Sequence, residues 1–124
     1  MGDPGSIVAR LKPVFGVVAK RLVIKTDRPD LYTLASGVAS PIPQHKGRPL
    51  EFACIRVGKA YVSLHLLPVY MNPALGEGIS PELKKRMQGK ACFNFKDDPE
   101  PALVAELKRI AEAGLKQWAE KKWA

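Results

Sequence analysis

The sequence contains little that would define a secreted or membrane-embedded protein. Its 124 residues include only two cysteines, too few for the disulfide framework of a small secreted domain. Apolar runs such as Val14–Ala19 are far shorter than the roughly 20 residues of a transmembrane helix. The residues around Asp3 and Pro4 lack the basic segment and apolar stretch of a secretory signal. We therefore expect a cytoplasmic protein without a membrane partner.

The motifs of common enzymes are also missing. The chain has no phosphate-binding glycine fingerprint, no G-x-S-x-G elbow and no closely spaced pair of zinc ligands such as CxxC or HxxxH. No set of residues meets the geometric requirements of a reaction class. We predict a protein that is not an enzyme and that uses no cofactor and no resident metal.

The chain has fewer acidic than basic residues. Lys and Arg number 20 against 12 Asp and Glu, a net charge of +8, which could attract nucleic acid, anionic lipid or an acidic partner. The surplus is spread along the chain, and its densest cluster is Lys84-Lys85-Arg86. Because no nucleic-acid motif accompanies it, a solvated surface is the favoured interpretation, with nucleic-acid binding as the alternative.

The spacing of the apolar residues, which make up 46% of the chain, changes along the first half. They first recur at intervals of three and four, as in an amphipathic helix, at Ile7, Leu11, Phe15, Val18 and Leu22. Pro13 interrupts this pattern, so we predict a kink or two short helices. Branched residues then predict strands over 22–24 and 31–34 around a turn at 27–30, with a surface loop over 37–49.

A hairpin is the clearest local signal. Two strand-like runs, Leu50–Val57 and Ala60–Leu67, flank Gly58-Lys59, which suits a two-residue type II′ turn. In that register Ala53, Ile55 and Val57 point to the core. The opposite face carries three cross-strand pairs, Arg56–Tyr61, Cys54–Ser63 and Phe52–His65. The sequence thus predicts a mixed polar and aromatic surface on one side of the sheet.

The second half adds a strand between two helices. After a connector over 68–78, Ser80-Pro81-Glu82 predicts the start of a short helix that ends at Gly89. A strand follows over 90–96, and Asp98-Pro99-Glu100 predicts the start of a long helix, with Asp98 as its expected cap. Its buried stripe consists of Leu103, Leu107, Ile110, Ala111, Gly114 and Trp118. Trp123 lies beyond the last predictable turn, so we expect it to be loose.

These elements predict one α+β domain over residues 1–124. Its mostly antiparallel sheet has about five strands. An N-terminal helix, a short middle helix and a long C-terminal helix pack on that sheet.

Two groups of side chains suggest chemistry. Cys54, His65 and Cys92 carry ligand types that zinc and iron prefer, but a fourth ligand is missing, and free cysteines mostly behave as small hydrophobes. Ser63 and His65 share a strand face roughly 7 Å apart, too far for a nucleophile and its base. A hydrogen-bonded surface or the lining of a pocket is the favoured interpretation.

Four aromatic residues are candidates for stacking on a base or a flat ligand: Tyr32, Phe52, Tyr61 and Tyr70. Aromatic residues are also common in strands for packing reasons, which we favour for Phe52. Both interpretations stay open for Tyr61, since Arg56 is its expected neighbour.

Two stretches, GKAYVSLHLLPVY over 58–70 and SPELKKRMQGKACFNF over 80–95, resemble the YdhG-like family of small bacterial domains of unknown function. The resemblance covers residues 50–115 well and the first half loosely. It implies a compact α/β sandwich without enzymatic activity. Some members are named frataxin-like intracellular iron chaperones. Iron binding of that kind is expected to need clustered carboxylates, whereas Asp97-Asp98 is the only adjacent acidic pair here.

The favoured hypothesis is an uncharacterised YdhG-like domain that binds a small molecule or a protein through the polar face of its sheet. The residues expected to do so are Arg56, Tyr61, Ser63, His65, Cys92 and Asn94. An iron-chaperone-like protein and a basic, nucleic-acid-associated module are the alternatives. Either a monomer or a homodimer is compatible with the sequence.

Overall fold

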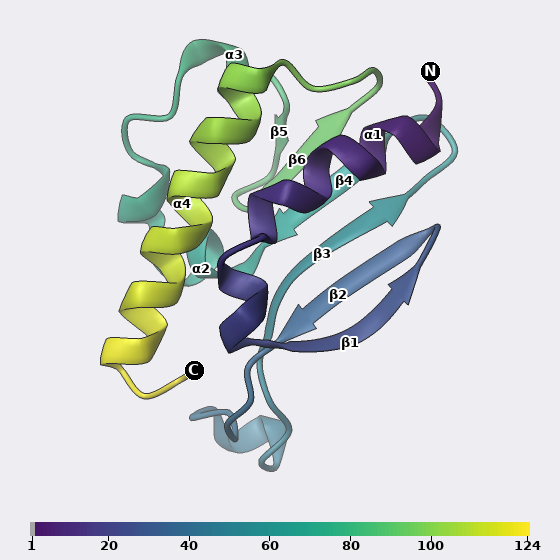
Figure 1. The fold of residues 1–124 in the computed structure, drawn as a ribbon. Helices are drawn as coiled ribbons and strands as arrows, with labels where there is room; N and C mark the ends of the chain where they lie inside the picture. The colour runs from purple at the N-terminus through teal and green to yellow at the C-terminus, as the bar shows by residue number, and fades with distance from the viewer. Residues whose placement is uncertain (1) are drawn as a thin grey trace.

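A computed structural model describes residues 2–124 of the chain, and Met1 lies outside the described residues. Its six strands form one antiparallel sheet in the order β1-β2-β3-β4-β6-β5, with the long helix and the N-terminal helix on one face (Figure 1). The expected α+β class is therefore confirmed, with six strands in place of about five. The strands are β1 (Val23–Arg28), β2 (Leu31–Ala35), β3 (Glu51–Val57), β4 (Val62–Leu66), β5 (Met87–Gln88) and β6 (Cys92–Phe95). The helices are α1 (Pro4–Leu11), α2 (Leu67–Met71), α3 (Pro81–Lys84) and α4 (Pro101–Glu120), and the 3-10 turns are η1 (Lys12–Phe15), η2 (Val18–Arg21), η3 (Pro43–His45) and η4 (Pro73–Gly76).

The N-terminal segment breaks where proline predicts it. Helix α1 ends at Leu11, and Pro13 lies in the 3-10 turn η1 that follows. Asp3 caps α1 by accepting a hydrogen bond from the Ser6 amide at 3.2 Å. All five apolar positions of the predicted helical pattern are buried, because the turns η1 and η2 keep them on the side of the sheet.

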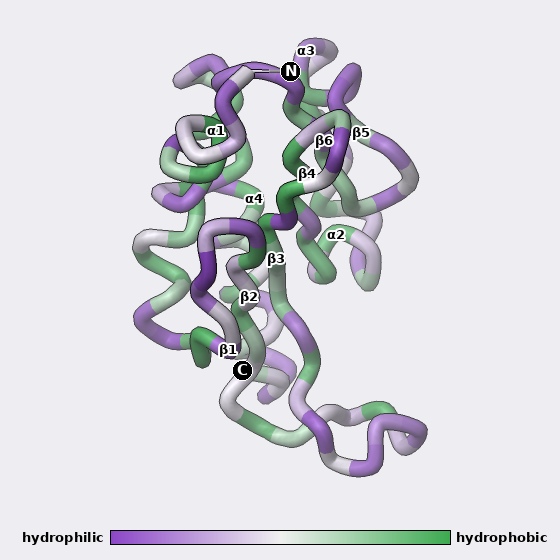
Figure 2. The backbone as a smooth tube through the Cα atoms, turned by 90° about the vertical axis from the view of Figure 1, so that its right-hand side faces the viewer, coloured by the Kyte–Doolittle hydropathy of each residue, from purple (hydrophilic) through white to green (hydrophobic). Residues whose placement is uncertain are grey.

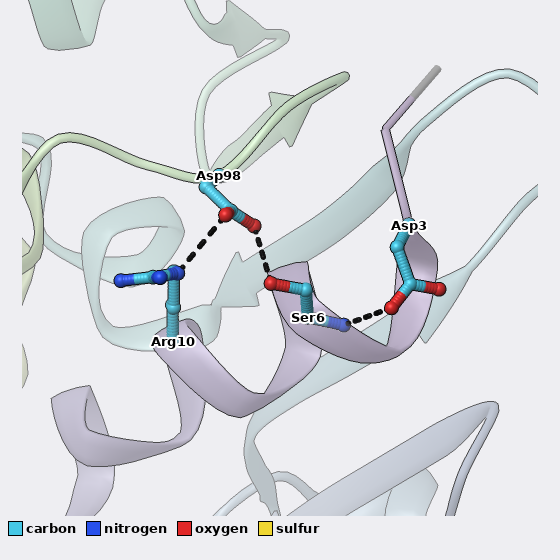
Figure 3. Close-up of polar contacts among 4 residues, drawn as sticks. All are labelled: Asp3, Ser6, Arg10 and Asp98. Carbon is cyan, nitrogen blue, oxygen red and sulfur yellow. Dashed lines mark hydrogen bonds and ion pairs between the residues drawn. The ribbon is translucent and has the colours of Figure 1, made fainter.

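The long helix begins later than its start signal suggested. Glu100 is the N-cap residue of α4, so the expectation that Asp98 caps this helix is wrong. Asp98 instead accepts a hydrogen bond from the Ser6 hydroxyl at 2.8 Å and pairs with Arg10 at 3.0 Å (Figure 3). These contacts fasten α1 to the segment between β6 and α4. They are exposed, so each contributes little to stability.

Five of the six residues predicted for the buried stripe of α4 are buried, and Ile110 is half-buried. Trp118 packs edge-on against Phe52 with ring centroids 5.1 Å apart. The expectation that Phe52 lies on the polar face is wrong, since its side chain is fully buried. The pairing of β2 with β3 shifts between Leu34 and Ala35, which leaves Phe52 as the extra residue of a β-bulge. A bulge redirects a side chain, and here it turns Phe52 toward the helices.

The connector between β4 and α3 is mostly helical, contrary to the expectation of an irregular segment. It forms α2 and η4, which begin at or next to prolines whose fixed φ angle suits a first turn. Helix α2 packs against α4 at Gly114. A Cβ atom at Gly114 would lie 2.7 Å from the Cβ of Pro68, so only glycine allows this approach.

The hairpin of β3 and β4 has a four-residue loop over 58–61 where the sequence predicts two residues. The Gly58 amide donates to the Tyr61 carbonyl at 2.9 Å and closes this wider loop. Arg56 consequently pairs with Ser63, and Cys54 pairs with His65. The expected pairs were wrong by two residues. A slip of two leaves Cys54, Ser63 and His65 on their expected face, and Phe52 leaves that face because of the bulge.

Helix α3 is shorter than predicted and leaves room for a further strand. Ser80 caps it as expected, accepting from the Leu83 amide at 3.2 Å, but the helix ends at Lys84. Met87 and Gln88 then form β5, which pairs with β6 through a turn in which Gly89 has a φ of 78°. Glycine adopts this backbone conformation at no steric cost.

The C-terminal residues are anchored. The Trp123 amide donates to the Trp118 carbonyl at 2.7 Å, and the Ser36 hydroxyl donates to the Trp123 carbonyl. The Trp123 ring lies edge-on to Trp118, with centroids 6.2 Å apart. The expectation of a loose Trp123 is therefore wrong. The loop between β2 and β3 extends from the body of the molecule (Figure 2).

Candidate binding face

The two faces of the central strands differ in composition. Along β4, buried Val62, Leu64 and Leu66 alternate with half-buried Ser63 and His65, and β6 alternates in the same way. The half-buried side chains all belong to the face opposite α1 and α4, which we call the polar face. Two rows of paired residues cross it. One runs Thr33–Cys54–His65–Cys92–Gln88 and the other Leu31–Arg56–Ser63–Asn94.

Hydrogen bonds link the polar face across β4, β6 and β5. Ser63 Oγ donates to Asn94 Oδ1 at 2.8 Å, and Cys92 Sγ lies 3.5 Å from the same oxygen. Asn94 Nδ2 donates to Gln88 Oε1 at 2.7 Å, and the Tyr61 hydroxyl reaches that oxygen at 3.4 Å. Four of the six predicted residues therefore meet in one network around Asn94. The network fixes the amide of Asn94 and leaves the Gln88 amino group to donate elsewhere.

Gln88 and Glu51 are residues of this face that the sequence did not predict. Gln88 was assigned to the end of a helix, because a two-residue strand carries no periodicity. Glu51 lies beside Cys54, although its spacing of three along β3 would normally put the two on opposite faces. The bulge at Phe52 explains this placement, because an extra residue inverts the alternation beyond it.

The four candidate aromatic residues do not gather on one surface. Tyr32 is buried, stacks with Phe15 at 6.4 Å and lies under the Lys12 ammonium. Phe52 is in the core, and Tyr70 is exposed on α2. Only Tyr61 borders the polar face. A platform for stacked bases needs several rings in succession, so the arrangement of these residues does not provide one.

Cys54, His65 and Cys92 lie in one row without forming a metal site. Neighbouring strands are about 4.8 Å apart, so the two cysteines, with β4 between them, are separated by roughly 10 Å. Thiolates that share a zinc ion at about 2.3 Å each cannot be that far apart. Within residues 2–124, no group of three or more His, Cys, Asp or Glu side chains is arranged to hold a metal ion.

The environment of Cys54 opposes ionisation. Burial raises the pKa of its thiol to about 11, and the neighbouring Glu51 carboxylate adds to the rise. Near neutral pH the group is a protonated thiol, which is a poor nucleophile and a poor metal ligand. Ser63 likewise lacks activation, because its hydroxyl is bonded to Asn94 and not to His65. The polar face is therefore suited to hydrogen bonding rather than to covalent chemistry.

Charge on the polar face is separated along β3. Arg56 is exposed near the hairpin loop, and none of the ion pairs among residues 2–124 includes it. Glu51 lies five residues away at the other end of the strand, roughly 17 Å by strand rise. His65 is diagonal to Arg56 in the register, within reach of its long side chain. The end of the face near the hairpin loop thus offers donors.

Five cavities that indent the described residues lie outside the polar face. Their linings contain no residue of the two polar rows. Met87 lines one of them and faces the opposite side of β5 from the polar rows. None of the helices in this part of the chain has the length and apolar character to cross a bilayer.

Comparison with known proteins gives no relative for this chain. No family model matches it, and neither a curated protein nor a solved structure is similar enough to count as a match. The resemblance to the YdhG-like family therefore stays a prediction.

Proposed function

We propose that the protein is a non-enzymatic binding module whose polar face docks an acidic segment of a partner protein. The observation that carries this proposal is Arg56, an exposed guanidinium without an ion-pair partner among the described residues, next to a fixed hydrogen-bond network. A guanidinium recognises carboxylates through two parallel hydrogen bonds.

The position of the five cavities outside the polar face favours a protein over a small molecule as its ligand. Small ligands are usually held in concave, mostly apolar sites, whereas protein partners bind flatter surfaces with polar rims. The net charge of +8 favours an acidic partner and would speed its approach. The positive charge would also attract a nucleic acid. Its bases would gain little from stacking, since Tyr61 is the one aromatic candidate that borders the face.

Fluorescence anisotropy with a labelled hexaglutamate peptide tests the proposal. The Arg56→Gln variant should bind about fivefold more weakly, the ratio that corresponds to roughly 1 kcal/mol. Arg109→Gln is the matched control, because it removes the same charge from an exposed position on α4. It should change the affinity by less than about twofold.

Three outcomes would contradict the proposal. One is equal weakening by both variants, which would indicate attraction by net charge alone. Another is equal binding of citrate, which would indicate a small-anion site. The third is tighter binding of an oligouridylate of equal charge, which would favour the nucleic-acid alternative.

A further inference from the structure

A cavity of about 530 Å³ lies between α2, η4 and β5, apart from the polar face. Val69, Ile79 and Met87 provide apolar surface, and the charged groups in its lining are Glu77, Lys84 and Lys90. Met87 pairs with the buried Phe93 and so faces away from the polar rows. The volume falls within the range of about 300–1,000 Å³ that is usual for small-ligand sites.

The two lysines of this cavity are available to a ligand. Both are exposed, and none of the four ion pairs among residues 2–124 includes either ammonium group. Glu77 is also exposed and also lacks such a pair, so the lining has an excess of one positive charge. An apolar wall below two ammonium groups suits a molecule with an aliphatic body and an anionic head.

Three other cavities of the described residues lack two unpaired lysines over an apolar wall. In the cavity between α1 and the start of α4, Arg10 already pairs with Asp98 at 3.0 Å, which leaves Lys108 as the one unpaired cation of the lining.

The groove between η2 and α4 balances Arg21 and Lys116 with Glu112 and Glu120. In the cavity beside the start of α4, Glu106 already accepts from the amide and hydroxyl of Ser80 at 2.7 and 2.6 Å. Neither of these two sites leaves an excess of positive charge over an apolar wall.

We infer that the cavity between α2, η4 and β5 binds a small aliphatic carboxylate, with Lys84 and Lys90 holding the carboxylate and Val69, Ile79 and Met87 contacting the alkyl chain. Methionine suits such a wall because its flexible side chain adapts to the shape of the ligand. The cavity lining contains no aromatic ring, so a flat aromatic acid would gain no stacking there.

Titration with octanoate, followed by NMR of protein labelled at the methionine methyl groups, tests this inference. The Met87 methyl signal, assigned from a Met87→Leu variant, should shift to saturation, whereas the signal of Met71 outside the cavity lining should move little. Exchanging both lysines in Lys84→Gln/Lys90→Gln should weaken binding about tenfold, through two charge contacts of ordinary strength. Lys85→Gln removes the same kind of charge next to the cavity and should have less than about a twofold effect.

Neutral and cationic analogues of octanoate distinguish recognition of the carboxylate from burial of the alkyl chain. Octylammonium should not produce the Met87 shift, and 1-octanol should bind more weakly than octanoate. The inference is contradicted if octanol and octanoate bind equally, if Lys85→Gln weakens binding as much as the double variant, or if the Met87 signal shows no saturable shift. Because the probe is monitored at Met87, failure here would leave the proposal for the polar face unaffected.

Discussion

The two faces of the sheet are built from the same strands yet obey different constraints. On the packed face, Ile55, Leu64 and Phe93 are fully or almost fully buried. Close packing there restricts the size of each neighbouring side chain. On the polar face, the adjoining Ser63, Cys92 and Asn94 are half-buried and are linked by hydrogen bonds. The difference indicates that stability depends mainly on the first face, whereas the second can vary its chemistry without loss of the fold.

The largest loss of stability is expected from a substitution at the bulge residue of the packed face. Phe52→Ala should lower the free energy of unfolding by about 3–5 kcal/mol, because it removes a fully buried ring that packs against Trp118. Urea denaturation monitored by tryptophan fluorescence measures the change. Phe52→Leu, which keeps most of the volume, should lose much less. A loss below about 1 kcal/mol for the alanine variant would contradict the bulge geometry.

The reactivity of the Cys54 thiol tests whether the polar face is partly shielded from water. In a Cys92→Ser variant, iodoacetamide should alkylate Cys54 about a hundredfold more slowly near neutral pH than an ordinary thiol, since a pKa of about 11 lies two units above the usual 9.0. The rate should rise tenfold per pH unit up to pH 10 without levelling. Levelling near pH 9 would show that the thiol is not buried in this way.

A smaller loss of stability is expected from a substitution where α2 contacts α4. Gly114→Ala should destabilise the protein by about 1–2 kcal/mol, because the clash with the rigid Pro68 ring outweighs the gain in helix propensity. Gly5→Ala in α1 is the matched control, since its Cβ would meet only Asp3 oxygens at 3.7 and 3.8 Å. That control should leave stability unchanged or slightly higher. Equal effects at the two sites would contradict close packing at Pro68.

The smallest effect on stability is expected on the polar face. Asn94→Ala should cost about 1 kcal/mol or less in denaturation experiments, because its partners Ser63 and Gln88 can turn to water. The same variant should reduce binding of the hexaglutamate peptide. A stability loss comparable to that of Phe52→Ala would show that the network is part of the core and not a binding surface.

Much of this arrangement could be predicted from alternation and helical spacing alone. The faces of Arg56, Ser63 and His65 were assigned correctly despite a register error, because a two-residue and a four-residue hairpin loop preserve the same alternation. Long-range contacts could not be predicted. The bulge that turns Phe52 inward depends on Trp118, and the anchoring of Trp123 depends on Ser36.

The position of the β5 strand was unpredictable for a related reason. Gln88 joins the polar face only because its two-residue strand pairs with β6, and so short a segment has no pattern of its own. Asn94, at the centre of the hydrogen-bond network, was predicted as a residue of the polar face. Its hydrogen bond to Gln88 depends on the pairing of β5 with β6.

A map of peptide binding on the protein tests the central claim most directly. In a titration of nitrogen-15-labelled protein with hexaglutamate, the largest amide shifts should fall on β3, β4 and β6 around Arg56, His65 and Asn94, and α4 should stay nearly unchanged. Shifts concentrated on α1 and α4, or spread evenly over all exposed lysines and arginines, would contradict the assignment of binding to the polar face.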